Sequence, residues 1–208
     1  MDAVCLISGG MDSCVAAAMA RADGWTIRAL SFDYGQKNRR ETDAARAVAR
    51  ALGARDHRVL AVDLSWTSSS LVREEMEIPE SVPDGIPSTY VPARNTVFIA
   101  LALSYAETLD AGAIYIGVNA VDYSGYPDCR PAYVERWRDL IACAVKKTVE
   151  GGTIRLETPL LSMTKAGIVA KGRELGVDFA LTWSCYRGGQ RPCGRCPSCI
   201  LRAKGFAE

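Results

Sequence analysis

The clearest chemical signal lies near the N-terminus, in the segment Ser8-Gly9-Gly10-Met11-Asp12-Ser13. It follows residues 3–7, an apolar run too short for a buried helix, and it precedes residues 14–20, which have helix-forming composition. A strand, a two-glycine turn and a helix start bring free backbone N–H groups together at the positive end of a helix dipole. Such a turn can bind phosphate or pyrophosphate. Its glycines let the backbone approach the ligand, its serines add hydroxyl donors, and its aspartate can hold Mg²⁺.

The turn is neither of the two common phosphate loops. It lacks the Gly-Lys-Ser/Thr ending of the Walker loop and the third glycine of the dinucleotide fingerprint. It resembles instead the Ser-Gly-Gly-x-Asp-Ser loop of the ATP pyrophosphatases, which activate an oxygen as an adenylate. The alternative is a plain helix start that is capped by Ser8 or Asp12. We expect Mg-ATP to contact Leu6, Ile7, Ser8, Gly9, Gly10, Met11, Asp12, Ser13, Cys14, Val15 and Ala16.

Lys165 is a second candidate phosphate ligand. It follows Thr164, the expected N-cap of a predicted helix, and a cation at a helix start opposes the dipole unless an anion is bound nearby. An ordinary solvated lysine is the equal alternative. Together with Asp12 and Arg94, Lys165 completes the set of residues that we expect to act in catalysis.

Three segments are polar and aromatic where a packing sequence would be apolar, namely residues 32–36, 91–95 and 117–130. An aromatic ring can stack on a base, a carboxylate can accept two N–H donors from a guanine-like edge, and an arginine can bind a carboxylate through two hydrogen bonds. One such segment would be an exposed loop, but three at one edge of a sheet indicate a binding site. The candidate substrate-binding residues are Phe32, Tyr34, Gln36, Arg94, Asn95, Asn119, Asp122, Tyr123, Tyr126, Asp128 and Arg130.

Four cysteines cluster near the C-terminus, at Cys185, Cys193, Cys196 and Cys199. The last three form two overlapping C-x-x-C units. Four thiolates at such spacing suit the tetrahedral coordination of structural zinc, which leaves no open position for catalysis. An iron–sulfur cluster is the alternative, because C-x₂-C-x₂-C also holds such clusters. We expect one Zn²⁺ per subunit.

Strand candidates alternate with helical patterns, which predicts a doubly wound α/β fold with a parallel sheet. The expected strands are residues 3–7, 25–32, 59–62, 113–118 and 154–156, and the expected later helices are residues 38–52, 96–109, 133–149 and 164–175. Residues 65–90 show no sustained periodicity and are interpreted as a mobile loop or lid. The length fits a single domain, residues 1–208, that includes the cysteine motif at 185–199.

Composition argues against several classes of partner. Hydrophobic residues make up 49% and charged residues 24% of the chain, and the net charge is +1, so nothing favours a nucleic-acid partner. No apolar stretch is long enough to cross a membrane, and the first residues lack the basic region of a signal peptide. We expect a cytoplasmic protein whose eight cysteines stay reduced. The single histidine, His57, precedes a predicted strand and is interpreted as structural.

Taken together, these motifs resemble the 7-cyano-7-deazaguanine synthase family of queuosine biosynthesis. The resemblance rests on residues 8–13, 32–36, 91–95, 117–130 and 183–186 with the cysteine run, and it covers nearly the whole chain. It implies an adenine nucleotide alpha hydrolase-like fold of ATP pyrophosphatase type, and a homodimer. The implied activity converts 7-carboxy-7-deazaguanine and ammonia to the nitrile through two ATP-dependent adenylations. Free ammonia is the expected nitrogen source, because the chain shows no glutaminase segment.

For a deazaguanine substrate, the chemistry of these side chains also suggests roles within the substrate site. Asp128 is expected to bind the N1–H and the exocyclic amine of the deazaguanine, and Arg94 or Arg130 to face its carboxylate. Two other functions compete. A tRNA-thiolating enzyme would share the ATP loop and use cysteines as persulfide carriers, but it should carry a basic RNA-binding extension. A non-catalytic nucleotide-binding module with a zinc ribbon would not need three aromatic and charged segments at one edge.

Overall fold

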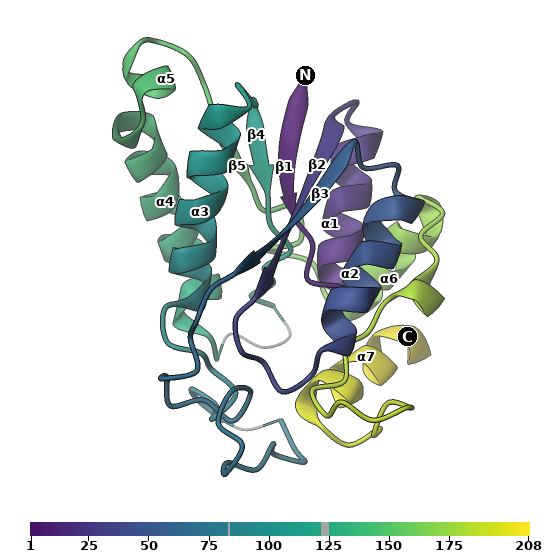
Figure 1. Cartoon of the computed structure of the whole chain (residues 1–208). Coiled ribbons are helices and arrows are strands. Elements are labelled where there is room, and N and C mark those ends of the chain that lie inside the picture. Colours follow the sequence, from purple (N-terminus) through teal and green to yellow (C-terminus); the bar gives the residue numbers. More distant parts are fainter. Residues whose placement is uncertain (83, 122–124) are drawn as a thin grey trace.

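The computed structural model describes residues 1–82, 84–121 and 125–208, and a parallel five-stranded sheet forms its centre (Figure 1). The strands are β1 (Asp2–Leu6), β2 (Thr26–Asp33), β3 (Asp56–Ala61), β4 (Ala113–Tyr115) and β5 (Arg155–Glu157). Their order is β3-β2-β1-β4-β5, so the sheet is built outward from β1 in both directions. In register, Val4 of β1 lies opposite Arg28 of β2 on one side and Ile114 of β4 on the other.

Helices cover both faces of this sheet (Figure 1). One face carries α1 (Met11–Ala22), α2 (Arg40–Ala51) and α6 (Lys165–Glu174), and the other carries α3 (Arg94–Thr108) and α4 (Pro131–Ala144). The last helix, α7 (Pro197–Ala207), packs on α6. Three shorter elements are η1 (Pro127–Cys129), α5 (Lys146–Val149) and η2 (Phe179–Leu181). The predicted doubly wound α/β class is therefore confirmed.

The two faces of the sheet bury different side chains. Val4 and Leu30 pack in a core that also contains Trp137 of α4. Ala3 and Cys5 face α1, whose alanines are almost all buried. Small side chains let α1 lie close to the sheet, which sets its N-terminus directly beyond the carboxyl end of β1. Burial raises the pKa of the Cys5 thiol to about 12, so this cysteine is an inert core residue.

All five predicted strands are confirmed, with boundaries shifted by at most three residues. The prediction of a single helix over residues 133–149 is wrong. Val145 is extended, with φ −130° and ψ 152°, so α4 ends before it and α5 is a separate turn. Thr164 caps α6 as predicted, because its hydroxyl accepts the Gly167 N–H at 3.1 Å. The predicted helices do not include α7, which begins inside the cysteine run.

The described part of residues 65–90 contains no helix or strand, as predicted, but it is not a detached lid. Ser69 and Ser70 are fully buried. Leu71 and Val72 belong to the same hydrophobic core as α3. The segment is irregular because it lacks periodicity, yet its apolar residues hold it against the body of the protein.

His57 belongs to β3, whereas the sequence analysis set it before the strand. Its Nε2 lies 2.7 Å from Ser31 Oγ on the neighbouring strand β2. Burial lowers the pKa of the ring, so His57 is neutral near pH 7. This geometry agrees with a structural role.

Candidate active site and cysteine cluster

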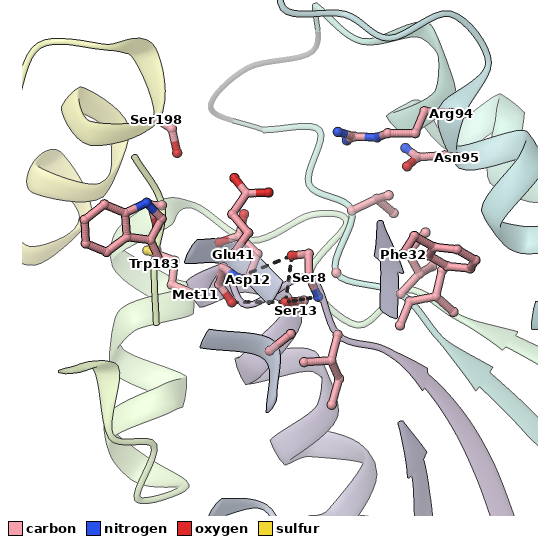
Figure 2. Close-up of a pocket in the computed structure, with 18 of the residues that line it drawn as sticks. Ser8, Met11, Asp12, Ser13, Phe32, Glu41, Arg94, Asn95, Trp183 and Ser198 are labelled. Carbon is pink, nitrogen blue, oxygen red and sulfur yellow. Dashed lines mark hydrogen bonds between the residues drawn. The ribbon is translucent and has the colours of Figure 1, made fainter. Parts of the chain in front are cut away.

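A cavity of about 300 Å³ lies beyond the carboxyl ends of β1 and β4 (Figure 2). Its walls come from the Ser8–Ser13 turn, residues 116–119 after β4, and the first turns of α2, α3 and α7. At this point the order of the strands reverses, which is where open α/β sheets bind ligands. Of the predicted nucleotide contacts, the residues that line the cavity are Leu6, Ile7, Ser8, Gly10, Met11, Asp12, Ser13 and Lys165; Gly9, Cys14, Val15 and Ala16 do not.

The predicted phosphate-binding turn, Ser8–Ser13, is called the phosphate turn below, and its own side chains hold it in shape. Ser13 Oγ accepts the Ser8 N–H at 3.1 Å and donates to the Gly10 carbonyl at 3.0 Å. Gly9 has a φ of +85°, and a Cβ at this position would lie 2.3 Å from the Glu41 carbonyl oxygen. Glycine is therefore required here for packing against α2, whereas the sequence analysis assigned it to the approach of a ligand. The serine hydroxyls likewise brace the turn.

Asp12, in the first turn of α1, forms an ion pair with Lys165, the first residue of α6. The Lys165 ammonium donates to Asp12 Oδ2. Asp12 Oδ1 is buried and has no hydrogen-bond partner among the described residues. An unsatisfied buried oxygen costs about 1–3 kcal/mol, and a bound cation would satisfy it. A carboxylate oxygen is a preferred ligand of Mg²⁺, so Asp12 fits this ion.

Gly117, the second residue after β4, packs directly on the same turn. A Cβ at Gly117 would lie 2.8 Å from the Asp12 carbonyl carbon and 2.8 Å from the Ser13 nitrogen. Only glycine permits this approach of two backbone segments. Gly117 was predicted to lie near the end of a strand and to begin the polar segment 117–130, and its close approach to the turn explains why a glycine stands there.

The opposite wall carries the predicted aromatic and arginine residues. The Arg94 guanidinium donates to the Tyr34 hydroxyl at 3.2 Å and lies over the Tyr34 ring, 5.5 Å from its centroid. Burial raises the pKa of Tyr34 to about 12, so the phenol is neutral. Phe32 stacks on Phe98 with ring centroids 3.9 Å apart, which already covers one face of the ring predicted to stack on a base. Figure 2 shows Arg94 and Asn95 facing the phosphate turn across the cavity.

Three more of the predicted residues line the cavity and also fasten its backbone. Gln36 Oε1 accepts the Tyr34 N–H at 2.8 Å. Asn119 donates through Nδ2 to carbonyl oxygens of the segment that precedes α6. The Tyr126 hydroxyl lies 2.8 Å from Thr89 Oγ1. These contacts fix the loops that carry the three residues.

Asp128, in η1, is buried against the start of α3 and does not line the cavity. Its Oδ2 accepts the Asn95 N–H at 3.0 Å, and its carbonyl accepts the Asn95 amide at 3.1 Å. In this geometry Asp128 caps α3 and so positions Arg94 and Asn95. Arg130 is likewise not a cavity residue. Asp122 and Tyr123 lie outside the described residues.

The cavity lining also includes residues that the predicted site lacks, among them Glu41, Trp183, Ser198 and Arg202. The Trp183 N–H donates to the Gly9 carbonyl at 2.8 Å. In Figure 2 the Ser198 hydroxyl and the Glu41 carboxylate both reach toward the open centre. Burial raises the pKa of the Glu41 carboxyl to about 7, although the positive charge of Arg94 acts to lower it. Acidic residues are common in the first turn of a helix because they interact favourably with the helix dipole. The position of Glu41 in the sequence therefore gave no functional signal.

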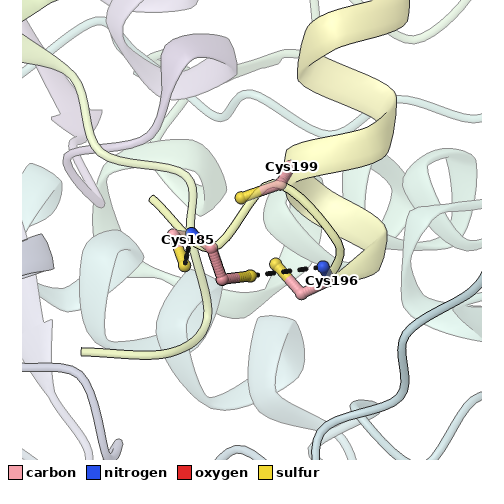
Figure 3. A group of neighbouring side chains, drawn as sticks. Cys185, Cys196 and Cys199 are labelled. Atoms are coloured by element: carbon pink, nitrogen blue, oxygen red, sulfur yellow. Dashed lines mark hydrogen bonds between the residues drawn. The ribbon is translucent and has the colours of Figure 1, made fainter. Parts of the chain in front are cut away.

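The four predicted metal-binding cysteines come together, with all Sγ atoms within 4.8 Å of one another. Figure 3 shows the sulfurs of Cys185, Cys196 and Cys199 gathered around one centre. Zn–S bonds of about 2.3 Å set the sulfurs of a tetrahedral site roughly 3.8 Å apart. The Cys196 N–H donates to Cys193 Sγ at 3.3 Å, and the Cys193 N–H to Cys185 Sγ at 3.4 Å. The cluster therefore fits a closed four-thiolate metal site.

The cysteine cluster adjoins the cavity. Cys196 and Cys199 flank the first turn of α7, which carries Ser198 and, one turn later, Arg202 into the cavity wall. The Asn38 amide, just before α2, donates to the Cys185 carbonyl at 2.6 Å. A metal bound to the cluster would consequently hold one wall of the cavity.

The parallel sheet, the glycine–serine turn at its switch point and the adjoining cavity define a nucleotide-binding fold of the α/β class. A 4-thiouridine synthetase solved in complex with RNA and with bound ATP shares this fold, with a TM-score of 0.52 and 21% identity. That match covers all of this chain and 53% of the synthetase chain. None of the described helices has the length and apolar character needed to cross a membrane.

The sequence sets the chain in one family of this class. Residues 2–208 match the family described as Queuosine biosynthesis protein QueC. A 7-cyano-7-deazaguanine synthase from Pseudomonas aeruginosa is 53% identical, over 99% of this chain and 93% of its own length. Relatives of the same name from Pseudomonas syringae and Alcanivorax borkumensis are 54% and 50% identical, over 98% and 99% of this chain and 92% and 94% of theirs. The chain belongs to the QueC family, as its motifs predicted.

Proposed function

We propose that this protein makes 7-cyano-7-deazaguanine from 7-carboxy-7-deazaguanine and ammonia, with ATP as the adenylating reagent. Its relatives bear the name of that synthase. The observation that carries the proposal is that the Ser8–Ser13 turn and the Arg94–Tyr34 pair line a single cavity. A nucleotide on the turn and an acid beside the arginine would meet there.

The turn and its neighbours would bind Mg-ATP. Backbone N–H groups at the start of α1 suit the phosphates, and Asp12 Oδ1 would ligate the Mg²⁺ that ATP carries. Lys165 would exchange its carboxylate partner for phosphate oxygens and neutralise charge on the departing pyrophosphate. Leu6 and Ile7, with Ala45 of α2, give an apolar strip for the adenine ring.

The deazaguanine acid would occupy the other side of the cavity. Arg94 would hold its 7-carboxylate, because a guanidinium matches a carboxylate through two parallel hydrogen bonds. Tyr34 and Tyr126 would supply aromatic surface, and Asn95 lines the cavity beside Arg94. Asp122 and Tyr123 belong to the same proposed set.

A carboxylate and an amide are both poor electrophiles, and the proposed reaction activates each of them in turn by adenylation. Attack of the carboxylate oxygen on the α-phosphorus of ATP forms an acyl adenylate and releases pyrophosphate. Ammonia then displaces AMP and leaves the amide. A second adenylation, at the amide oxygen, again makes AMP the leaving group, and its elimination gives the nitrile. Positioning and charge neutralisation are the main demands on the protein.

The cysteine cluster is proposed to hold one Zn²⁺ per chain in a structural role. Four thiolates would fill the coordination shell and leave no open position for a substrate. When bound, the metal supplies a cross-link between Cys185 and the first turn of α7. A cytoplasmic location, in which the thiols stay reduced, goes with this proposal.

The test is to incubate the protein with MgATP, ammonium and 7-carboxy-7-deazaguanine and to analyse the products by mass spectrometry. We expect the nitrile together with AMP and pyrophosphate, and no product when ATP or ammonium is omitted. ATP turnover that ignores the deazaguanine acid, or transfer of sulfur to tRNA by the same preparation, would contradict the proposal.

A further inference from the structure

The Glu41 carboxylate occupies the cavity without a structural task of its own. Glu41 is the second residue of α2, and its backbone is fixed because its carbonyl packs against Gly9. Its side chain lines the cavity and extends above the phosphate turn, between Ser198 and Arg94 (Figure 2). No described side chain forms a hydrogen bond or an ion pair with its carboxylate, whereas Asp12 is paired with Lys165.

The electrostatic surroundings of Glu41 suit a proton acceptor. The ionisable groups that share the cavity with it are Asp12, Lys165, Arg94, Tyr34, Tyr126, Cys129, Tyr186 and Arg202. Burial raises the pKa of Glu41 to about 7, and the positive charge of Arg94 limits this rise. Burial also raises the pKa values of Tyr34 and Cys129, each to about 12, so neither would take up a proton near neutral pH. A carboxyl with a pKa near the working pH can accept a proton in one step and release it before the next.

The proposed reaction needs such a group, because nitrogen loses three protons on the way from ammonia to nitrile. One is lost when the C–N bond forms and the bond to AMP breaks. The second leaves as the amide oxygen bonds to phosphorus and pyrophosphate departs. The third leaves as the remaining C–O bond breaks and AMP is expelled. No redox partner is required, since ATP supplies both leaving groups.

We propose that Glu41 is a catalytic residue that accepts these protons from the nitrogen. This inference rests on the proposed function and adds a residue role to it. Among the described cavity residues, Glu41 is the carboxylate that is not already held by an ammonium. Its carboxylate extends into the cavity above the turn proposed for ATP, and the arginine proposed for the acid lies across the cavity from it (Figure 2). In this proposal the carbon that changes its substituents occupies the space that Glu41 faces.

The alternative is that Glu41 only stabilises the start of α2. Asp43 provides a matched control, because it lies in the same first turn but pairs with the exposed Arg46 outside the cavity. A helix-dipole role would make the Glu41→Gln and Asp43→Asn variants behave alike. A role in proton transfer would separate them in kinetics while leaving their stability similar.

The experiment starts from the 7-carboxamide with MgATP, which removes the ionisation of ammonium from the pH profile. Wild-type nitrile formation should fall as the pH drops through about 7, because a protonated Glu41 cannot accept a proton. Glu41→Gln should slow this step by about 10²-fold or more and lose that pH dependence, with partial recovery in Glu41→Asp. Pyrophosphate exchange that depends on the 7-carboxylate, which removes no proton from nitrogen, should stay within a few-fold of wild type. Asp43→Asn should match wild type throughout.

A Glu41→Gln variant that forms nitrile at the wild-type rate, or with the wild-type pH profile, would overturn the inference while leaving the proposed function intact. If that variant does not fold, a wild-type rate from the amide that is flat between pH 6 and pH 8 would overturn it equally. A wild-type protein that makes no nitrile from either substrate would overturn the proposed function, and this inference with it.

Discussion

Gly117→Ala should damage the phosphate turn through a single added methyl group. The Cβ would lie 2.8 Å from two backbone atoms, the Asp12 carbonyl carbon and the Ser13 nitrogen, and 2.9 Å from Ser13 Cα. Ordinary contact begins at 3.4 Å, so the turn would have to retreat by about 0.6 Å (3.4 Å minus 2.8 Å). Backbone atoms on both sides of the contact leave no flexible side chain to absorb the shift.

Two magnitudes follow from that displacement. Overpacking of this kind costs about 1–3 kcal/mol of folding free energy, which lowers the melting temperature by roughly 2–12 °C in a chain of this size. A misplacement of 1 Å in a reacting group can cost about 10²-fold in rate. We therefore expect ATP–pyrophosphate exchange, measured with the deazaguanine acid, to fall by about 10-fold or more.

Gly24→Ala is the matched control. Gly24 has a φ of +85° and nothing within 4 Å of its added Cβ, so alanine would cost about 1–2 kcal/mol of strain without moving the phosphate turn. Differential scanning calorimetry and the exchange assay on both variants separate the two effects. If Gly117→Ala kept full exchange activity, or if Gly24→Ala lost as much, the geometric reasoning would be refuted.

Two further predictions concern the charged pair and the metal. Asp12→Asn should reduce ATP turnover by about 10²-fold because it removes the proposed Mg²⁺ ligand, and full turnover with an unchanged circular dichroism spectrum would contradict that role. Elemental analysis should find one zinc per chain, and chelation should expose the segment from Cys185 to α7 to proteases and raise the KM for ATP, because α7 lines the cavity. A brown protein with visible absorption would instead identify an iron–sulfur cluster.

Much of the fold could be predicted because its signals are local. The inner strands β1, β2 and β4 contain short apolar runs, as parallel strands buried on both faces require. The edge strands β3 and β5 are less buried, and only part of each is apolar. The end of α4 had no such signal, because no glycine or proline stands at or next to Val145, although Val145 is extended. The start of α7 was not predicted because it lies within the cysteine run, which was interpreted only as a metal-binding motif. Pro197 at its N1 position is nevertheless a signal for a helix start.

The site was less predictable because residue type does not specify contacts. Phe32 is an aromatic at the right edge, yet Phe98 already stacks on it. Asp128 has a carboxylate that could accept the N–H donors of a deazaguanine, yet it caps α3 and lies outside the cavity lining. Glu41 is inconspicuous in sequence because helix starts attract acidic residues, and only the fold shows that it faces the phosphate turn. The four cysteines were predictable because their spacing alone limits where their thiols can meet.

The central claim, that this protein adenylates a deazaguanine acid twice, is tested most directly by oxygen labelling. The substrate is 7-carboxy-7-deazaguanine with ¹⁸O in both carboxylate positions, incubated with MgATP and ammonium. The account predicts two molecules of AMP for each nitrile, each carrying one ¹⁸O atom, and unlabelled pyrophosphate. Unlabelled AMP, or ADP and phosphate as the nucleotide products, would contradict it.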